Sequence, residues 1–268
     1  MLPVESAFDF NLLSQIEDAG LNASAPPQQR WVDGWLLRYS AGKAKRARCI
    51  NAVAEGRLPL ADRLAMCRSV FDQAALPLLV RLTPFTRPND LDSRLAHMGM
   101  TQLDDTRVMV LADMPTCRHA DMPTRDARPA NGSAIRALPL AAFAQCVGQM
   151  RGSPLAQRQA HAERLAAAPV PFSAFELRVD GRVLACGQFA IEDKLVGLYD
   201  VFTAPHARGR GLATALCTHL LDQAAQRGAR HAYLQVEGDN HAARQVYRRL
   251  GFADGYAYHY RVEMPESQ

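Results

Sequence analysis

Residues 201–214 read V-F-T-A-P-H-A-R-G-R-G-L-A-T, and the fold prediction starts from this stretch. An apolar run from Leu195 to Thr203 ends at Pro205. Two glycines follow, and after them alanines and leucines recur at helical spacing. The pattern predicts a strand, a glycine-rich turn and a helix, in that order.

The turn suits the binding of a phosphate group. Gly209 and Gly211 permit backbone angles closed to other residues and let a ligand approach the main chain. The first turn of the helix offers unpaired N–H groups and the positive end of the helix dipole. Arg208 and Arg210 add donors that match phosphate oxygens. An ordinary turn before a water-capped helix fits this stretch equally well, so a second motif has to decide.

A second motif lies downstream, where residues 240–252 read N-H-A-A-R-Q-V-Y-R-R-L-G-F after an extended stretch. Together the two motifs resemble the GNAT superfamily of acyl-CoA-dependent N-acyltransferases. The family pattern Q/R-x-x-G-x-G/A matches at Arg208, Gly211 and Ala213. The family pattern N-x-x-A-x-x-x-Y-x-x-x-G-F matches at every specified position. The resemblance covers about residues 134–264.

The resemblance implies acetyl-CoA as co-substrate and no metal. Main-chain groups of Val201, Phe202 and Thr203 would pair with the pantetheine arm and the acyl carbonyl. Backbone N–H groups of the turn would hold the pyrophosphate, and the expected binding residues there are Arg208, Gly209, Arg210, Gly211, Leu212, Ala213 and Thr214.

Two residues of the downstream motif have both a functional and a structural interpretation. Asn240 would bind the CoA arm, or it could cap the helix that follows, or do both. Tyr247 is a suitable general acid, because a phenol of pKa about 10 can protonate a thiolate leaving group. The alternative for Tyr247 is an aromatic ring packed on the core face of its helix.

The general base is not specified by the motifs. Protein N-terminal acetyltransferases of this superfamily carry a Glu immediately before the valine of the strand that precedes the Asn motif, but Gln235 stands here and cannot accept a proton. The nearest ionisable candidates are Asp200 and Glu237, on the two strands expected to separate around the CoA arm. Each could equally be a solvated or structural carboxylate. His206 and His241 flank the motifs and are expected at the surface.

Composition limits the possible partners. The chain has 268 residues, 48% hydrophobic and 22% charged, with a net charge of +4, which fits a globular protein that does not bind nucleic acid. The six cysteines are scattered and form no zinc-ligand pattern. No apolar run approaches the about 20 residues of a membrane span, so a cytoplasmic protein without membrane contact is expected. The preference for arginine over lysine indicates GC-rich coding and a bacterial source.

The fold class expected is α+β, with two GNAT-like folds in tandem. Each would be a mixed, mostly antiparallel twisted sheet flanked by helices, with a V-shaped splay of strands in the C-terminal half. Residues 1–113 would form the first domain, 114–133 a linker rich in Pro, Asp and Arg, and 134–268 the catalytic domain. The expected strands include 46–54 in the first half, with 252–257 and 258–264 at the end of the second.

The first half is interpreted as a degenerate copy of the second. The segment 92–100 aligns with 244–252, but Leu95 occupies the position of Tyr247, and no glycine-rich phosphate turn lies between Ala54 and Leu58. Two unrelated α+β halves are the alternative.

The leading hypothesis is an N-acetyltransferase that moves an acetyl group from acetyl-CoA to a primary amine of a small molecule or peptide, by direct attack in a ternary complex. The alternatives are a non-catalytic acyl-CoA-binding module and a protein N-terminal acetyltransferase. The sequence leaves open the acceptor, the acyl length and the choice between monomer and homodimer.

Overall fold

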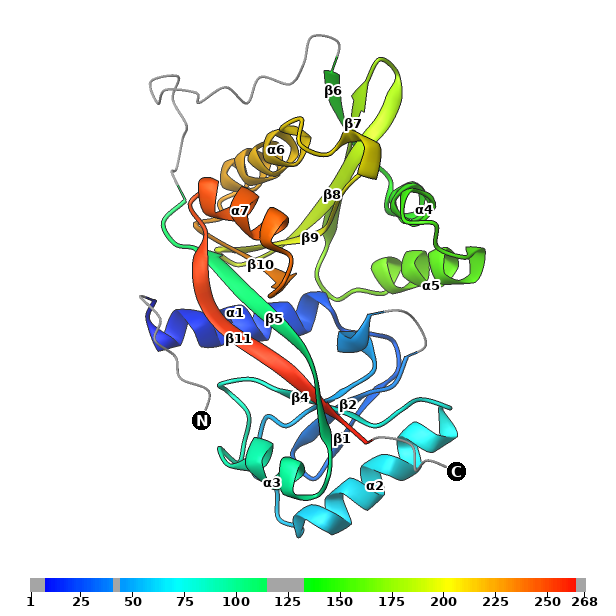
Figure 1. Ribbon diagram of the computed structural model, residues 1–268, viewed down its shortest axis with the longest axis vertical. Coiled ribbons are helices and arrows are strands. Elements are labelled where there is room, and N and C mark those ends of the chain that lie inside the picture. Colours follow the sequence, from blue (N-terminus) through cyan, green and yellow to red (C-terminus); the bar gives the residue numbers. More distant parts are fainter. Residues whose placement is uncertain (1–7, 41–43, 115–132, 264–268) are drawn as a thin grey trace.

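The computed structural model describes residues 8–40, 44–114 and 133–263. The chain is α+β, as predicted, and its strands form one sheet in the order β1-β2-β3-β4-β11-β5-β10-β9-β8-β7-β6 (Figure 1). Most of the predicted linker 114–133 lies outside the described residues.

The first half supplies three α-helices and the five strands at one side and the centre of the sheet. Its elements are α1 (Phe10–Ala23), β1 (Gln29–Val32), β2 (Trp35–Arg38), the 3-10 helix η1 (Lys45–Ala47), β3 (Ile50–Asn51), α2 (Leu60–Gln73), β4 (Leu79–Leu82), α3 (Leu91–His97) and β5 (Thr101–Leu111). The strand predicted at 46–54 was wrong in extent, because η1 takes its first residues and only Ile50 and Asn51 pair. Sequence patterning had favoured an extended chain there because a turn of 3-10 helix leaves no periodic signal.

The second half contains the predicted strand, glycine-rich turn and helix in that order. Its elements are β6 (Ser133–Leu138), α4 (Leu140–Met150), α5 (Leu155–Ala166), β7 (Phe172–Val179), β8 (Arg182–Glu192), β9 (Leu195–Thr203), η2 (Pro205–Ala207), α6 (Leu212–Gln226), β10 (His231–Glu237), α7 (His241–Arg249) and β11 (Ala253–Val262). The two strands predicted after 252 are one, β11. Its pairing with β5 shifts register between Asp254 and Tyr256 and between Tyr258 and Tyr260, so the strand bends without breaking.

The two halves exchange their last strands. β11 of the second half lies between β4 and β5 of the first, and β5 lies between β11 and β10. The pairing on the two sides of the β5–β11 pair follows one pattern, with one further edge strand, β6, in the second half. Two antiparallel pairs in the first half and three in the second are followed by a parallel pair, β3 with β4 and β9 with β10, and then by an antiparallel pair with the other half's strand. The halves are thus two copies of one topology, and the exchange merges their sheets.

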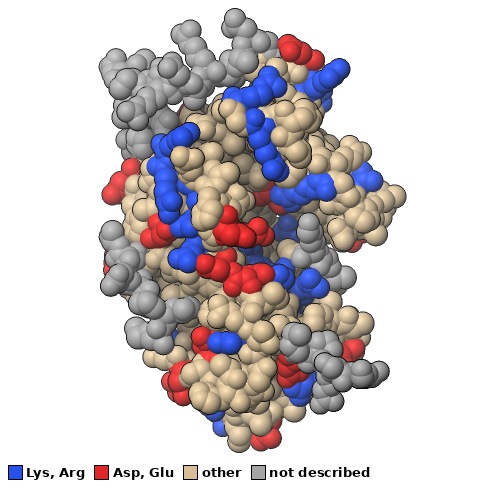
Figure 2. Space-filling model, viewed as in Figure 1, with Lys and Arg blue, Asp and Glu red and all other residues tan. Residues whose placement is uncertain are grey.

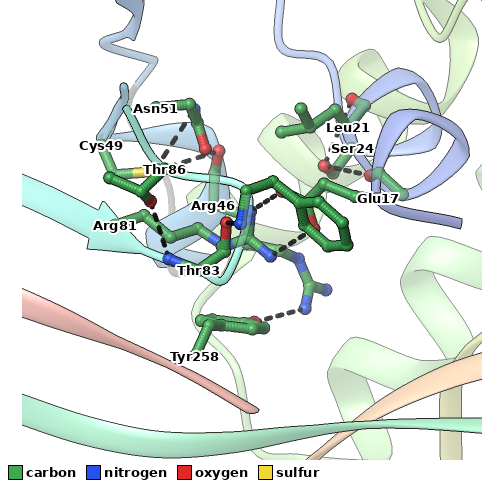
Figure 3. A network of polar contacts seen from close by, with 12 residues as sticks. Glu17, Leu21, Ser24, Arg46, Cys49, Asn51, Arg81, Thr83, Thr86 and Tyr258 are labelled. Atoms are coloured by element: carbon green, nitrogen blue, oxygen red, sulfur yellow. Dashed lines mark hydrogen bonds and ion pairs between the residues drawn. The ribbon is translucent and has the colours of Figure 1, made fainter. Parts of the chain in front are cut away.

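A buried polar network stabilises β11 in its position beside the strands of the first half (Figure 3). Glu17 of α1 forms an ion pair with Arg81 of β4, and the hydroxyl of Tyr256 on β11 donates to Glu17 Oε2 at 2.6 Å. The Arg81 guanidinium also lies 3.9 Å from the ring centroid of Tyr258. The last strand of the second half is therefore held by charged groups of the first.

α6 provides the main helical layer on the second half of the sheet. It buries Leu212, Leu216 and Leu220 against β8, β9 and β10. Its apolar spacing fixes which side faces the sheet and so directs the first turn of the helix to the end of β9. α4 and α5 pack against each other beside β7 and β8.

Candidate functional site

The glycine turn before α6 is open. Gly209 has φ +77° and Gly211 has φ +75°, a region that non-glycine residues rarely adopt. A Cβ atom at either position would meet no heavy atom within 4 Å, so the main chain is bare on that side. Arg208 and Arg210 flank it and are exposed. The turn therefore presents its backbone and two guanidinium groups to one open space.

The first turn of α6 has unused N–H groups. Gly211 is its N-cap and has no side chain to accept from them, and the first intrahelical bond runs from Ala215 N to Gly211 O at 3.0 Å. The N–H groups of the residues between them point toward the helix N-terminus, where the dipole is positive. A pyrophosphate is the group that this arrangement fits.

The strands β9 and β10 separate just before the turn. Their parallel pairing ends at Leu198 and Leu234, while β9 continues beside β8 as far as Thr203. Asp200, with φ +50°, forms a bulge opposite β8 at this point. The predicted V-shaped splay is present, and the edge of Val201, Phe202 and Thr203 that faces β10 has no partner strand among the described residues. Arg208 Nε donates to the Thr203 carbonyl at 3.4 Å. That edge could hydrogen-bond an extended ligand arm.

Tyr247 of α7 packs beside α6 at the same end of the sheet. It is half-buried, its ring centroid lies 6.1 Å from that of Phe252, and it borders the core of the second half. Burial raises the pKa of the Tyr247 phenol above its usual value, and Cys217 acts in the same direction. The hydroxyl is therefore protonated at neutral pH, the state that a proton donor needs. Asn240 caps α7, accepting from Ala243 N at 3.2 Å.

Asp200 is held by three side chains from the second half. Arg151 donates to its Oδ1 at 2.9 Å, Gln188 donates to Oδ2 at 2.8 Å, and His161 Nε2 lies 3.2 Å from Oδ2. Burial alone would raise the pKa of the Asp200 carboxyl. The close contact of His161 and the charges of Arg151, His161 and Arg164 outweigh burial and hold that pKa far below its usual range. Asp200 is therefore a fixed negative charge at the splay.

Two recesses meet at Asp200. The inner recess, about 110 Å³, lies between the splay, the end of α1 and η1, with Ser24, Arg46, Gln188, Tyr199 and Gln235 in its wall. The outer recess, about 370 Å³, lies between α4 and α5 of the second half and the loops around Pro26 and Ala44 of the first. Ala44, Ala47, Arg164 and Asp200 line both recesses, so the two adjoin. Both halves of the chain form the walls.

Of the other residues considered from the sequence, Glu237, His206 and His241 line neither recess, whereas Gln235 lines the inner one. Glu237, at the end of β10, is exposed and lines neither recess. His206 and His241 are exposed, as expected. Gln235 lines the inner recess, where its Oε1 accepts from Arg46 at 2.5 Å and from the Tyr258 hydroxyl at 2.8 Å. Of the residues proposed as bases, the structure brings only Asp200 to the cleft.

Sequence reasoning missed the side chains that surround Asp200. Arg151 directly follows α4, His161 and Arg164 lie on α5, and Arg46 lies on η1 of the first half. The particular residues were not recognisable because no local motif joins them to β9.

In the first half, a carboxylate of the protein occupies the turn before α2. Asp33, in the β1–β2 turn, accepts from the N–H groups of Arg57 at 2.9 Å and Leu58 at 2.9 Å, and Arg63 Nε lies 2.9 Å from Asp33 Oδ2. These donors stand just before α2, as the open turn stands before α6. A carboxylate of the protein therefore occupies the place that an anionic ligand would take.

Charges on the surface are mixed. Figure 2 shows basic and acidic side chains interspersed over one face rather than a single continuous basic stripe. Within the described residues, no helix is long and apolar enough to cross a membrane.

The splayed strand pair and the open glycine turn at a helix start are features that the resemblance to the GNAT superfamily predicted. The sequence model described as Acetyltransferase (GNAT) family matches residues 140–252. The chain carries a GNAT acetyltransferase domain within a tandem GNAT fold, as the sequence motifs indicated.

Relatives and solved structures agree with this assignment. The uncharacterized N-acetyltransferase YobR of Bacillus subtilis is 24% identical over 88% of this chain and 92% of its own. A GCN5-related N-acetyltransferase from Kribbella flavida has a TM-score of 0.66 at 19% identity and covers 97% of both chains. A tandem GNAT protein from the clavulanic acid biosynthesis pathway has a TM-score of 0.58 at 16% identity, covering 77% of this chain and 70% of that one. The similarity to the Kribbella flavida structure extends over both halves of this chain.

Proposed function

We propose that this protein is an N-acetyltransferase that moves an acetyl group from acetyl-CoA to a primary amine of a small molecule or peptide. The supporting observation is that the open glycine turn and the recesses at Asp200 both lie beside the β9–β10 splay. The open turn at Gly209 and Gly211 lies at one end and the recesses at Asp200 at the other. Two substrates could bind together there, so we propose direct attack in a ternary complex.

Acetyl-CoA would supply an activated acyl group as a thioester. The bare backbone of the turn and the unused N–H groups of Leu212, Ala213 and Thr214 would hold its pyrophosphate, with Arg208 and Arg210 beside it. The free edge of Val201, Phe202 and Thr203 would bind the pantetheine arm. Asn240, which already caps α7, would contribute through its remaining hydrogen-bonding groups. Orientation of the thioester by fixed backbone groups contributes to catalysis.

For proton removal from the amine we propose His161 together with Asp200. Asp200 is too firmly ionised to be an effective base, but it can hold the imidazole in the tautomer that leaves the other ring nitrogen free to accept a proton. Glu237 is the alternative base and would need a water relay. Tyr247 would donate a proton to the departing thiolate as the C–S bond breaks.

The other two hypotheses have less support. A pure acyl-CoA-binding module needs neither a half-buried phenol beside α6 nor a close His–Asp pair. A protein N-terminal acetyltransferase would place a Glu where Gln235 stands, and Gln235 is engaged by Arg46 and Tyr258.

We propose one acetyl-CoA site per chain, in a catalytic domain of residues 134–268. Residues 1–113 would be the degenerate copy and 114–133 the linker. The carboxylate of Asp33, held by backbone N–H groups at the start of α2, supports this division of roles.

Two measurements test the proposal. Calorimetry with acetyl-CoA is expected to give one site per chain, and thiol release with a panel of amines is expected to give turnover. A stoichiometry of two would contradict the single site. Tight acetyl-CoA binding without turnover on any amine would favour the binding module.

A further inference from the structure

The inner recess contains two cations without carboxylate partners. Arg46 donates to the neutral groups Gln235 Oε1 and Tyr258 OH, at 2.5 and 3.3 Å, and forms no ion pair with a described carboxylate. Arg164 makes no hydrogen bond or ion pair in the described part of the chain. Burial lowers the pKa of Arg164, the charge of Asp200 opposes this without forming an ion pair, and the charge of Arg46 acts in the same direction as burial. Guanidinium groups stay ionised, so both positive charges remain.

Two buried atoms of the same recess also lack partners. Nε of Arg46 is a donor and Oε1 of Gln188 an acceptor, and neither has a hydrogen-bond partner among the described residues. Gln188 is fully buried. Buried polar atoms are nearly always paired, because an unpaired one costs about 1–3 kcal/mol. The wall of the recess thus carries one buried donor and one buried acceptor that no described residue satisfies.

Asp200 adds a negative charge to the inner recess. Its Oδ1 accepts from Arg151 alone among the described residues, so one of its lone-pair sites is free. Asp200 is also the only acidic residue among the described ones that line the inner recess. One carboxylate, Asp200, and two guanidinium groups, those of Arg46 and Arg164, therefore line the same recess of about 110 Å³.

We propose that the acceptor is a free amino acid or a close analogue, whose amine lies at Asp200 and His161 and whose carboxylate lies between Arg46 and Arg164. This inference rests on the proposed acetyltransferase function and specifies its substrate class. The small volume requires the two charged groups of the acceptor to be only a few bonds apart. The remainder of the acceptor would extend into the outer recess.

The outer recess supports the same class of substrate. Arg151, Arg158 and Arg164 line it together with Glu163 and Asp200, and Asp200 already faces Arg151. A polycationic amine would bring further positive charge to these arginines. A peptide N-terminus would leave the guanidinium pair without a carboxylate, because its first carbonyl is an amide.

The test compares amino acids with their amides in a thiol-release assay with acetyl-CoA. The panel holds the common amino acids, the matching amides, the decarboxylated amines, spermidine and phosphoethanolamine with β-alanine. Wild-type protein is expected to prefer carboxylates over amides by roughly 10- to 100-fold in kcat/KM, the range for a lost charge-assisted hydrogen bond.

Variants test whether Arg164 causes the preference for a carboxylate over an amide. Arg164→Gln is expected to remove most of it by raising KM for the amino acid, with less than about twofold change for the amide. Arg164→Lys is expected to restore part of it. Arg182→Gln, at an exposed arginine at the start of β8, is the matched control and should leave both substrates unchanged. Acetyl-CoA affinity, measured for each variant, verifies that the protein is folded.

The outcomes separate this inference from the proposed function. Equal or better turnover of amides, decarboxylated amines or spermidine would overturn the inference and leave the acetyltransferase intact. A preference for phosphoethanolamine over β-alanine would overturn the choice of a carboxylate. No turnover with any amine would overturn both. An unchanged carboxylate preference in Arg164→Gln would also contradict the proposal.

Discussion

Nε2 of His161 lies 3.2 Å from Oδ2 of Asp200, which joins α5 to the bulge of β9 at the point where β9 leaves β10. The side chains of both residues are largely buried, with exposed fractions of 17% and 20%. The pair stands where the amine of an acceptor would approach a thioester held in the splay. Its geometry allows Asp200 to orient the ring and His161 to accept a proton.

Replacement of His161 by Gln is expected to lower kcat by at least about tenfold, because a general base typically contributes 10²- to 10⁴-fold and water replaces part of it. Acetyl-CoA affinity should change little, since His161 lies on the acceptor side. Single-turnover rates of both proteins measure the difference. A variant with the wild-type rate would exclude His161 as the base.

The sequence predicted the local parts of this fold well. The turn at Gly209 and Gly211 and the Asn240 cap are each specified by residues a few positions apart. Their backbone requirements are intrinsic to glycine and asparagine. These parts are therefore readable without knowledge of the rest of the chain.

The strand exchange was not predictable in the same way. β5 and β11 have equivalent positions in the two halves, and hydrophobic alternation does not specify which neighbour each strand joins. That choice depends on contacts such as Tyr256 with Glu17, which are 239 residues apart. The cluster of Arg46, His161 and Arg164 around Asp200 is non-local for the same reason.

Replacement of Gly211 by Val is expected to weaken acetyl-CoA binding by at least about tenfold. The side chain would stand where the backbone is open, and φ +75° is unfavourable for a β-branched residue. Gly228→Val is a matched control at the other end of α6, because φ there is +97° and its Cβ would also meet nothing within 4 Å. Calorimetry should show loss of affinity only in the first variant. Equal affinities would contradict the proposed phosphate cradle.

Replacement of Tyr247 by Phe is expected to slow acetyl transfer and leave acetyl-CoA affinity nearly unchanged, because the ring still packs beside Phe252. A general acid contributes about 10²- to 10⁴-fold, whereas an ordinary hydrogen bond contributes only about 0.5–1.5 kcal/mol. Single-turnover rates measure the chemical step directly. A decrease of less than about tenfold in that step would assign the phenol to packing or positioning.

Replacement of Glu17 by Gln is expected to destabilise the protein by about 3–5 kcal/mol at pH 7, because Arg81 stays buried without its charge partner. The hydroxyl of Tyr256 also loses its carboxylate acceptor, which weakens the attachment of β11 to α1. Denaturant unfolding of both proteins measures the difference. Glu55→Gln, at an exposed position before α2, is the control and should be neutral.

The same variant has a defined dependence on pH. Burial alone would raise the pKa of Glu17, but the charge and hydrogen bond of Arg81 outweigh burial and lower it. A carboxyl whose folded-state pKa lies below its unfolded value, about 4.3, stabilises the protein above that pH and loses this contribution as pH falls through the folded-state pKa. The free energy of unfolding should therefore differ most between wild type and Glu17→Gln at neutral pH and least in acid. A difference that stayed constant from pH 7 to pH 3 would show that the effect of Glu17 is steric and that its ion pair with Arg81 does not hold the exchanged strand.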